Sequence, residues 1–252
     1  MNKITLCLIA ANRPKYLREM LHSIRLQSCL DFDLVISDDS KDSLSSEEIA
    51  ALPNNALYVW NENSLGEAAN SNRVIQLAKT EYVALIHDDD KLDSEYVKEV
   101  LKYLEHNYPD ALMVNQWFIN TQGELIYRRR LDADQRSIKL VPRQTLIKML
   151  SLQKVHPIYT PGLIFKKKVF DKIEFSESIG THIDTNFVLK LLFSVESFDV
   201  LNQYLYFSRV SPKSGRGNSS RKGNSFLEQI NIYVDFYRHL EKTGKVIPGC
   251  SL

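Results

Sequence analysis

The chain has 252 residues, of which 44% are hydrophobic and 25% charged, as in a globular protein that can bury a sizeable core. Its formal net charge of +1 gives no reason to expect nucleic acid as a partner. No run approaches the roughly 20 apolar residues of a membrane-spanning helix. Three distant cysteines, Cys7, Cys29 and Cys250, predict reduced thiols in a cytoplasmic protein.

Strands and helices alternate through residues 1–110. Apolar runs predict strands at residues 4–10, 32–37, 56–60 and 83–86. Helices are predicted at residues 14–24, 45–52, 66–79 and 94–104. Pro14 suits the first turn of the first helix. This alternation predicts an α/β fold with a mostly parallel, Rossmann-like central sheet flanked by helices and joined by right-handed crossovers.

The second half is more mixed, and no linker or internal repeat separates it from the first. Strands are predicted at residues 111–119, 125–127, 163–165 and 200–207. Helices are predicted at residues 142–152, 185–195 and 230–237. Residues 211–225 carry four basic residues, no acidic residue and no anchor for a core. This composition predicts a flexible loop, which either closes over a ligand as a lid or is simply exposed.

An acidic stretch follows the fourth strand directly. Asp88, Asp89 and Asp90 come after His87, and ligands of open α/β sheets bind beyond the carboxyl ends of the strands. Three adjacent carboxylates repel one another unless a cation is present. Oxygen ligands suit Mg²⁺ or Mn²⁺, which usually also holds substrate phosphates. The alternative is a solvated acidic turn before the next helix, and these residues alone leave both open.

Polar side chains also follow the first two strands. Asn12 and Arg13 come after the first strand and Asp38 and Asp39 after the second, on the same side of the predicted sheet as the acidic stretch. No Gly-rich phosphate-binding loop follows the first strand. A nucleotide bound here would therefore need another means of neutralising its phosphates, and a metal on the acidic stretch would supply it.

Five short motifs occur in order along the chain. They are Asn12-Arg13-Pro14, Asp38-Asp39-Ser40, Leu65-Gly66, Asn72-Arg73 and His87-Asp88-Asp89-Asp90. In order and spacing they resemble family 2 glycosyltransferases with the GT-A fold. The resemblance implies one domain over residues 1–252, with a nucleotide-binding half in 1–110 and an acceptor-binding half and C-terminal helix in 111–252. It also implies an inverting enzyme that uses a nucleotide sugar and a divalent metal.

The resemblance assigns roles to individual residues. Asp39 would contact the uracil ring. Asp88 would contact the ribose or the metal, and Asp89 would be the main metal ligand with Asp90 in support. The nucleotide-binding set that it implies is Asn12, Arg13, Asp39, Asn72, Arg73 and Asp88.

Some positions depart from the family pattern. His87 stands where the family commonly has an Asp, although the later carboxylates of the motif remain. Ala10 and Ala11 replace a common Thr-Tyr pair, which reduces the contacts expected for stacking a base. Ser71 stands where an Arg is frequent, next to the motif that contains Arg73.

The resemblance implies that the catalytic base is a carboxylate at the start of a helix in the second half. Asp184 fits, because the apolar run 187–192 follows it. A carboxylate in this place is also a good helix cap, and without the resemblance that explanation would be preferred. His182 lies two residues earlier and is a candidate neighbour.

Two further groups of side chains have ordinary explanations. The basic clusters Arg128–Arg130 and Lys166–Lys168 would suit an anionic lipid or a pyrophosphate-linked acceptor, although such clusters are more often solvated faces. Trp117, Tyr127 and Tyr159 would suit stacking on a sugar, although aromatic residues are more often part of a core.

These observations predict a metal-dependent, inverting hexosyltransferase. It would move a sugar from a nucleotide sugar, a UDP-hexose, to a glycan or a polyprenyl-pyrophosphate-linked acceptor in cell-surface polysaccharide (O-antigen or capsule) synthesis. The cofactor would be Mn²⁺ or Mg²⁺, and the location cytoplasmic, with peripheral contact at the inner face of the membrane left open. The alternatives are a non-catalytic sugar-nucleotide or glycan-binding module and a metal-dependent nucleotidyltransferase.

Overall fold

The computed structural model describes residues 2–128, 136–150, 158–176, 183–210, 231, 232, 234–236, 238, 240 and 242. His182, Arg129, Arg130, the predicted loop at 211–225 and Cys250 lie outside these residues. Among the described residues, ten strands form one sheet.

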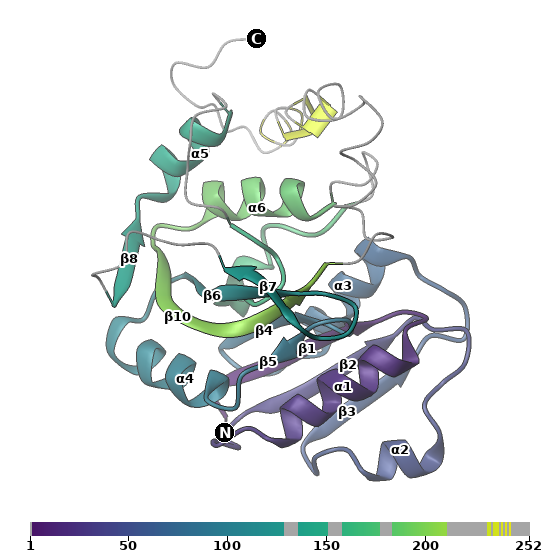
Figure 1. Ribbon diagram of the computed structural model, residues 1–252. Helices are drawn as coiled ribbons and strands as arrows, with labels where there is room; N and C mark the ends of the chain where they lie inside the picture. Colours follow the sequence, from purple (N-terminus) through teal and green to yellow (C-terminus); the bar gives the residue numbers. More distant parts are fainter. Residues whose placement is uncertain are drawn as a thin grey trace.

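Four parallel strands build the first half of the sheet (Figure 1). In spatial order they are β3 (Ala56–Trp60), β2 (Asp33–Asp38), β1 (Ile4–Ala10) and β4 (Tyr82–His87). Each is a largely apolar run. Their bounds lie within one residue of the predicted strands, so the parallel α/β architecture expected of this half is confirmed.

The second half extends the same sheet. The antiparallel strand β9 (Leu163–Lys166) lies between β4 and β6 (Ala111–Ile119), and β10 (Phe198–Arg209) runs parallel to β6. Three short strands complete it: β5 (Lys91–Leu92), β7 (Leu125–Arg128) and β8 (Ser137–Leu140). The sequence did not predict β5 or β8, because each is only two to four residues long and pairs with the distant β10.

Helices cover both faces of the sheet. They are α1 (Pro14–Arg25), α2 (Ser46–Ala50), α3 (Glu67–Leu77), α4 (Tyr96–Asn107), α5 (Pro142–Leu150) and α6 (Ile183–Ser194), with a 3₁₀ turn at Lys167–Val169. Residues from α1 and α4 form one core with the strands, and residues from α3 and α6 form the other. None of the helices in the described part of the chain has the length and apolar character needed to cross a membrane.

A tight contact between Gly162 and Tyr206 joins the halves of the sheet near the end of β4. Gly162 has φ of +77° and donates its N–H to the carbonyl of Leu85 at 2.7 Å. A Cβ on Gly162 would lie 2.9 Å from Cδ2 of the buried Tyr206 ring. The hydroxyl of Tyr206 donates to Asp90 at 2.8 Å and accepts from the N–H of His87. Glycine is therefore needed at position 162 for this ring to reach the acidic stretch.

We expect Gly162→Ala to destabilise the fold by about 1–3 kcal/mol more than Gly123→Ala. Gly123 also has positive φ, at +87°, but its added Cβ would meet the end of the flexible Lys91 side chain. Both variants incur the cost of alanine at positive φ, and only Gly162→Ala adds a clash with a buried ring. Urea unfolding of the two variants measures the difference, and equal losses would contradict the argument.

Candidate functional site

Arg13 joins two consecutive carboxylates at the carboxyl edge of the sheet. Its guanidinium lies 2.7 Å from Oδ1 of Asp88 and also contacts Oδ2 of Asp89. The other oxygen of Asp88 accepts the N–H of Ala11 at 2.9 Å. The structure therefore brings together three of the predicted site residues, Arg13, Asp88 and Asp89.

Burial controls the ionisation of this pair. The side chain of Asp88 is inaccessible to solvent, and burial raises its pKa to about 7, aided by the charge of Asp89 and opposed by Arg13 and the N–H of Ala11. Partial burial lowers the pKa of Arg13, but the two carboxylates outweigh it and hold that pKa above its ordinary value. This edge of the sheet therefore needs a cation once Asp88 is ionised.

Asp90 is held by β10, and its part as a supporting metal ligand stays a prediction. It is 2% exposed, and its two oxygens accept hydrogen bonds from the hydroxyl of Tyr206 and the N–H of Arg209, at 2.8 and 2.7 Å. Both partners belong to β10. Asp90 thus connects the acidic stretch to the second half of the sheet.

Asp88 and Asp89 are the carboxylates that fit a divalent cation. They already converge on one positive group, Arg13. Among the described residues, no group of three or more His, Cys, Asp or Glu side chains could hold a metal ion by itself. Two carboxylates completed by substrate phosphates are nevertheless a usual environment for Mg²⁺. The pair therefore suits a cation that arrives with a diphosphate.

The loop after β1 is tied to the loop after β2. Asn12 has φ of +55°, its N–H donates to the hydroxyl of Ser40, and its side-chain oxygen accepts the N–H of Lys41 at 2.9 Å. These bonds hold Asn12 at the edge where it was expected, next to Arg13. They also explain its left-handed backbone, which asparagine tolerates better than most residues.

Asp39 organises the chain that leads into α3. Its oxygens accept hydrogen bonds from Asn61, Ser64, Leu65 and Gly66 at 2.6–3.1 Å. Burial raises the pKa of Asp39, but the four hydrogen bonds together lower it by more than burial raises it. The pKa of Asp39 therefore lies below its ordinary value. Its contact with a uracil ring stays a prediction.

Asn72 connects α3 to the second half of the chain. Its amide donates to the carbonyl of Phe175 and accepts the N–H of the same residue, both at 2.9 Å. The Phe175 ring stacks on Phe187 of α6, with centroids 3.9 Å apart. Asn72 therefore positions α6, and its contact with a nucleotide stays a prediction. Arg73 makes no hydrogen bond or ion pair within the described part of the chain.

Asp184 lies in the first turn of α6, close enough to the acidic edge to act on a residue there. That residue is Glu67, the first residue of α3. Desolvation raises the pKa of Glu67, and the charge of Asp184 raises it further, while His87 and Arg13 oppose these effects. The charges of both Asp184 and Asp89 thus act on Glu67. The role of Asp184 as the catalytic base stays a prediction. Sequence reasoning missed Glu67, which directly follows the Leu65-Gly66 motif.

The basic and aromatic groups have mostly structural surroundings. Lys166 pairs with Asp110 at 3.0 Å and lies opposite Tyr82, so it is at the far end of β4 from the acidic stretch. Tyr127 stacks on Phe118, and Tyr159 meets the same ring edge-on. Trp117 contacts Tyr204 and Arg128.

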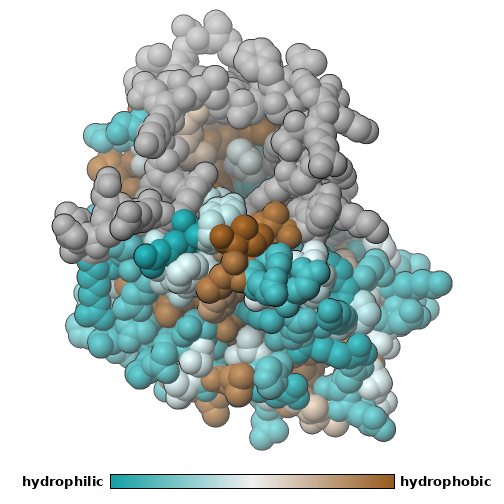
Figure 2. All heavy atoms as spheres, in the orientation of Figure 1, coloured by the Kyte–Doolittle hydropathy of each residue, from teal (hydrophilic) through white to brown (hydrophobic). Residues whose placement is uncertain are grey.

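An exposed apolar surface lies on β7. Three consecutive residues of β7 are exposed by 50–58%: Leu125, Ile126 and Tyr127. Figure 2, which has the orientation of Figure 1, shows an apolar area in the middle of the molecule. Such an area on a strand beside the site would suit contact with a ligand or a partner, but it is modest in extent.

The fold and the site define a class of α/β protein with two carboxylates and an arginine at the carboxyl edge of its sheet. A profile of the family described as glycosyl transferase family 2 matches residues 5–174. The chain therefore belongs to this family and is a glycosyltransferase, which favours the predicted enzyme over the binding-module and nucleotidyltransferase alternatives.

Similar proteins agree with this assignment. The chain is 24% identical to the uncharacterized glycosyltransferase MJ1057 of Methanocaldococcus jannaschii, over 82% of its own length and 70% of the relative's. It is 26% identical to the abequosyltransferase RfbV of Salmonella typhimurium, over 93% and 75% of the two chains. A structure of S. aureus TarS with UDP-GlcNAc superposes with a TM-score of 0.69 at 18% identity, over 92% of this chain and 66% of that one. These results confirm the GT-A fold.

We expect the stability cost of Asp88 to grow with pH in metal-free protein. Its pKa is about 7 in the folded chain and about 3.9 when unfolded. A group with a raised folded pKa contributes stability that is full below the unfolded value and lost as pH rises through the folded value. Relative to Asp88→Asn, the wild type should therefore become less stable between pH 5 and pH 8. Urea unfolding across this range with a chelator present measures it, and a constant difference would contradict the shift.

Proposed function

We propose that this glycosyltransferase moves a hexose from a UDP-sugar to a glycan or lipid-linked saccharide, with inversion at the anomeric carbon. The observation that carries the proposal is the pairing of Arg13 with Asp88 and Asp89 at the carboxyl edge of the sheet. The charge of Asp184 acts on Glu67, which also feels the charges of Arg13 and Asp89. This edge offers a cationic position for a diphosphate, and Asp184 offers a carboxylate on the other side of the reacting sugar.

Similar proteins support the donor and the biological setting. TarS, which has been crystallised with UDP and with UDP-GlcNAc, is described as a poly(ribitol-phosphate) β-N-acetylglucosaminyltransferase. RfbV is described as an abequosyltransferase. We therefore place this protein in the synthesis of cell-surface polysaccharide. The proposal includes a cytoplasmic location and a lipid-linked acceptor reached from the inner face of the membrane.

The reaction would be a single in-line displacement. Asp184 removes the proton from an acceptor hydroxyl as its oxygen attacks the anomeric carbon, and the bond to the nucleoside diphosphate breaks on the opposite face. The proton ends on Asp184, and the negative charge ends on the diphosphate. Arg13 lies where it can stabilise that charge, so alignment and electrostatics account for most of the catalysis.

We include a divalent cation, Mn²⁺ or Mg²⁺, held by Asp88 and Asp89. When bound it would neutralise the diphosphate and favour its departure. Asp88 would then be ionised, because a nearby positive charge lowers the pKa of a carboxyl. The roles of Arg13 in the free and bound states would differ, since the cation would compete with it for the same oxygens.

Donor binding is tested by thermal stability with a panel of nucleotides, with and without Mn²⁺. A ligand at 100 times its Kd stabilises the folded state by about 2.7 kcal/mol. We expect UDP to raise the midpoint only with Mn²⁺, and Asp89→Ala to abolish the shift. A metal-independent shift would remove the metal from the proposal, and a shift with another base would replace uridine.

Catalysis is tested by Asp184→Asn. We expect turnover to fall by about 10²–10⁴-fold, because a general base contributes this much, while the UDP-dependent thermal shift is retained. Asp171→Asn is the matched control, since Asp171 is exposed and lies on the segment that follows β9. Sugar transfer at the wild-type rate by Asp184→Asn would exclude Asp184 as the base.

A further inference from the structure

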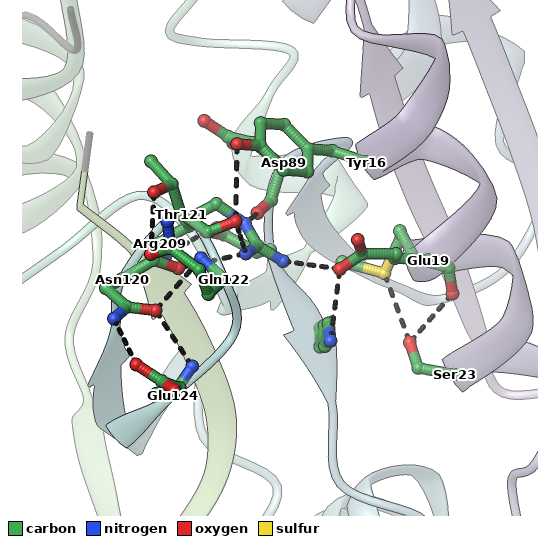
Figure 3. Close-up of polar contacts among 12 residues, drawn as sticks. Tyr16, Glu19, Ser23, Asp89, Asn120, Thr121, Gln122, Glu124 and Arg209 are labelled. Carbon is green, nitrogen blue, oxygen red and sulfur yellow. Dashed lines mark hydrogen bonds and ion pairs between the residues drawn. The ribbon is translucent and has the colours of Figure 1, made fainter. Parts of the chain in front are cut away.

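Arg209, the last residue of β10, lies at the centre of a buried network (Figure 3). Its side chain is 1% exposed. Nε donates to the main-chain carbonyl of Asp89 at 2.6 Å, Nη1 to the carbonyls of Asn120 and Thr121 at 2.9 and 3.2 Å, and Nη2 to Glu19 at 2.7 Å. One guanidinium thus connects the acidic stretch, the turn between β6 and β7, and helix α1.

The surroundings of Arg209 compensate for its burial. The ring of Tyr16 lies 4.3 Å from Cζ, which allows a cation–π contact. Glu19 supplies the opposite charge and also pairs with Lys91 at 3.0 Å. Burial raises the pKa of Glu19, but Lys91 and Arg209 together lower it by more than burial raises it. The pKa of Glu19 therefore lies below its ordinary value, and Glu19 stays ionised. The network therefore holds a paired cation with several hydrogen bonds, as a buried charge requires.

Arg209 holds two successive residues of the acidic stretch. Its side chain binds the carbonyl of Asp89, and its main-chain N–H binds the carboxylate of Asp90 at 2.7 Å. Two fixed points on adjacent residues restrict the main-chain angles between them. They therefore set the direction in which the Asp89 side chain leaves the chain, toward Arg13.

The turn between β6 and β7 is itself well ordered by hydrogen bonds. The side chain of Asn120 accepts the N–H groups of Gln122 and Glu124, both at 2.9 Å, and donates to the Glu124 carboxylate. The carbonyls that Arg209 binds are thus presented by a closed turn. A change at this turn would reach Asp89 through one side chain.

We propose that Arg209 is a positioning residue for the transfer reaction, which aligns the Asp89 carboxylate with the donor diphosphate and ties this alignment to the β6–β7 turn. The proposal rests on the function proposed above. Arginine is required because its planar group donates in several fixed directions, whereas a lysine ammonium cannot match three carbonyls and a carboxylate in this arrangement.

The test is Arg209→Lys. This substitution keeps the positive charge and removes the planar guanidinium, which donates hydrogen bonds in several fixed directions. We expect a folded protein whose kcat falls about 10–100-fold and whose half-saturating Mn²⁺ concentration rises by a similar factor, as for other residues that orient metal ligands. The donor KM at saturating Mn²⁺ should change by less than about threefold, because the Arg209 side chain is only 1% exposed and its hydrogen bonds go to the protein. Arg18→Lys is the matched control, since Arg18 of α1 is exposed and pairs with Glu48 of α2, and this change should leave these values unchanged.

Amide hydrogen exchange without substrate provides a readout that is independent of sugar transfer. In Arg209→Lys we expect faster exchange at both 87–92 and 117–125, with no change at 33–38 in β2. If Arg209→Lys does not fold, Glu19→Gln replaces it, because glutamine keeps an acceptor and removes the compensating charge; the same changes are expected, but smaller.

The outcomes separate the two proposals. If the wild type transfers no sugar, the proposed function fails, and exchange with Mn²⁺ binding still tests the positioning role. Faster exchange with unchanged kcat and Mn²⁺ dependence would show a purely structural role and overturn the inference. Wild-type exchange at 87–92 would overturn it as well.

Discussion

The site depends on one electrostatic constraint, which is that Asp88 and Asp89 must share a cation. Asp88 is fully buried, and a buried carboxylate without a partner costs several kcal/mol. Arg13 meets this need from the start of α1, so the edge of the sheet is assembled around a positive group before any ligand arrives. A cation that enters with a diphosphate would find two carboxylates already aligned.

Parallel register explains why these residues meet. Ala10 lies beside Asp38 on one side of β1, and Ile9 lies beside His87 on the other, so three strands end at the same level. The residues that follow each strand must then share a small volume beyond the edge. The need of Asp88 and Asp89 for a cation is therefore a consequence of strand pairing, and Arg13 supplies the positive charge.

The sequence predicted which residues lie at this edge of the sheet, but it did not predict the directions in which their side chains point. Apolar runs located the four parallel strands, and their order predicted that Arg13, Asp88 and Asp89 lie on the same side of the sheet. The inward turn of Asp90 was not predictable, because its partners Tyr206 and Arg209 are more than 110 residues away and no local pattern marks them. The short strands β5 and β8 were missed for the same reason, since the distant β10 defines both.

Hydrogen bonding separates the acids that build the site from those left for chemistry. Asp39 accepts four hydrogen bonds and Asp90 is held by Tyr206 and Arg209, so both help to hold the fold. Within the described residues, the side chains of Glu67 and Asp184 make no hydrogen bond, although their charges interact. A carboxylate kept near another without a partner is costly, and such costs persist mainly at functional sites. Glu67 on α3 and Asp184 on α6 are therefore the acids whose oxygens are left for the acceptor and the sugar in the proposed reaction.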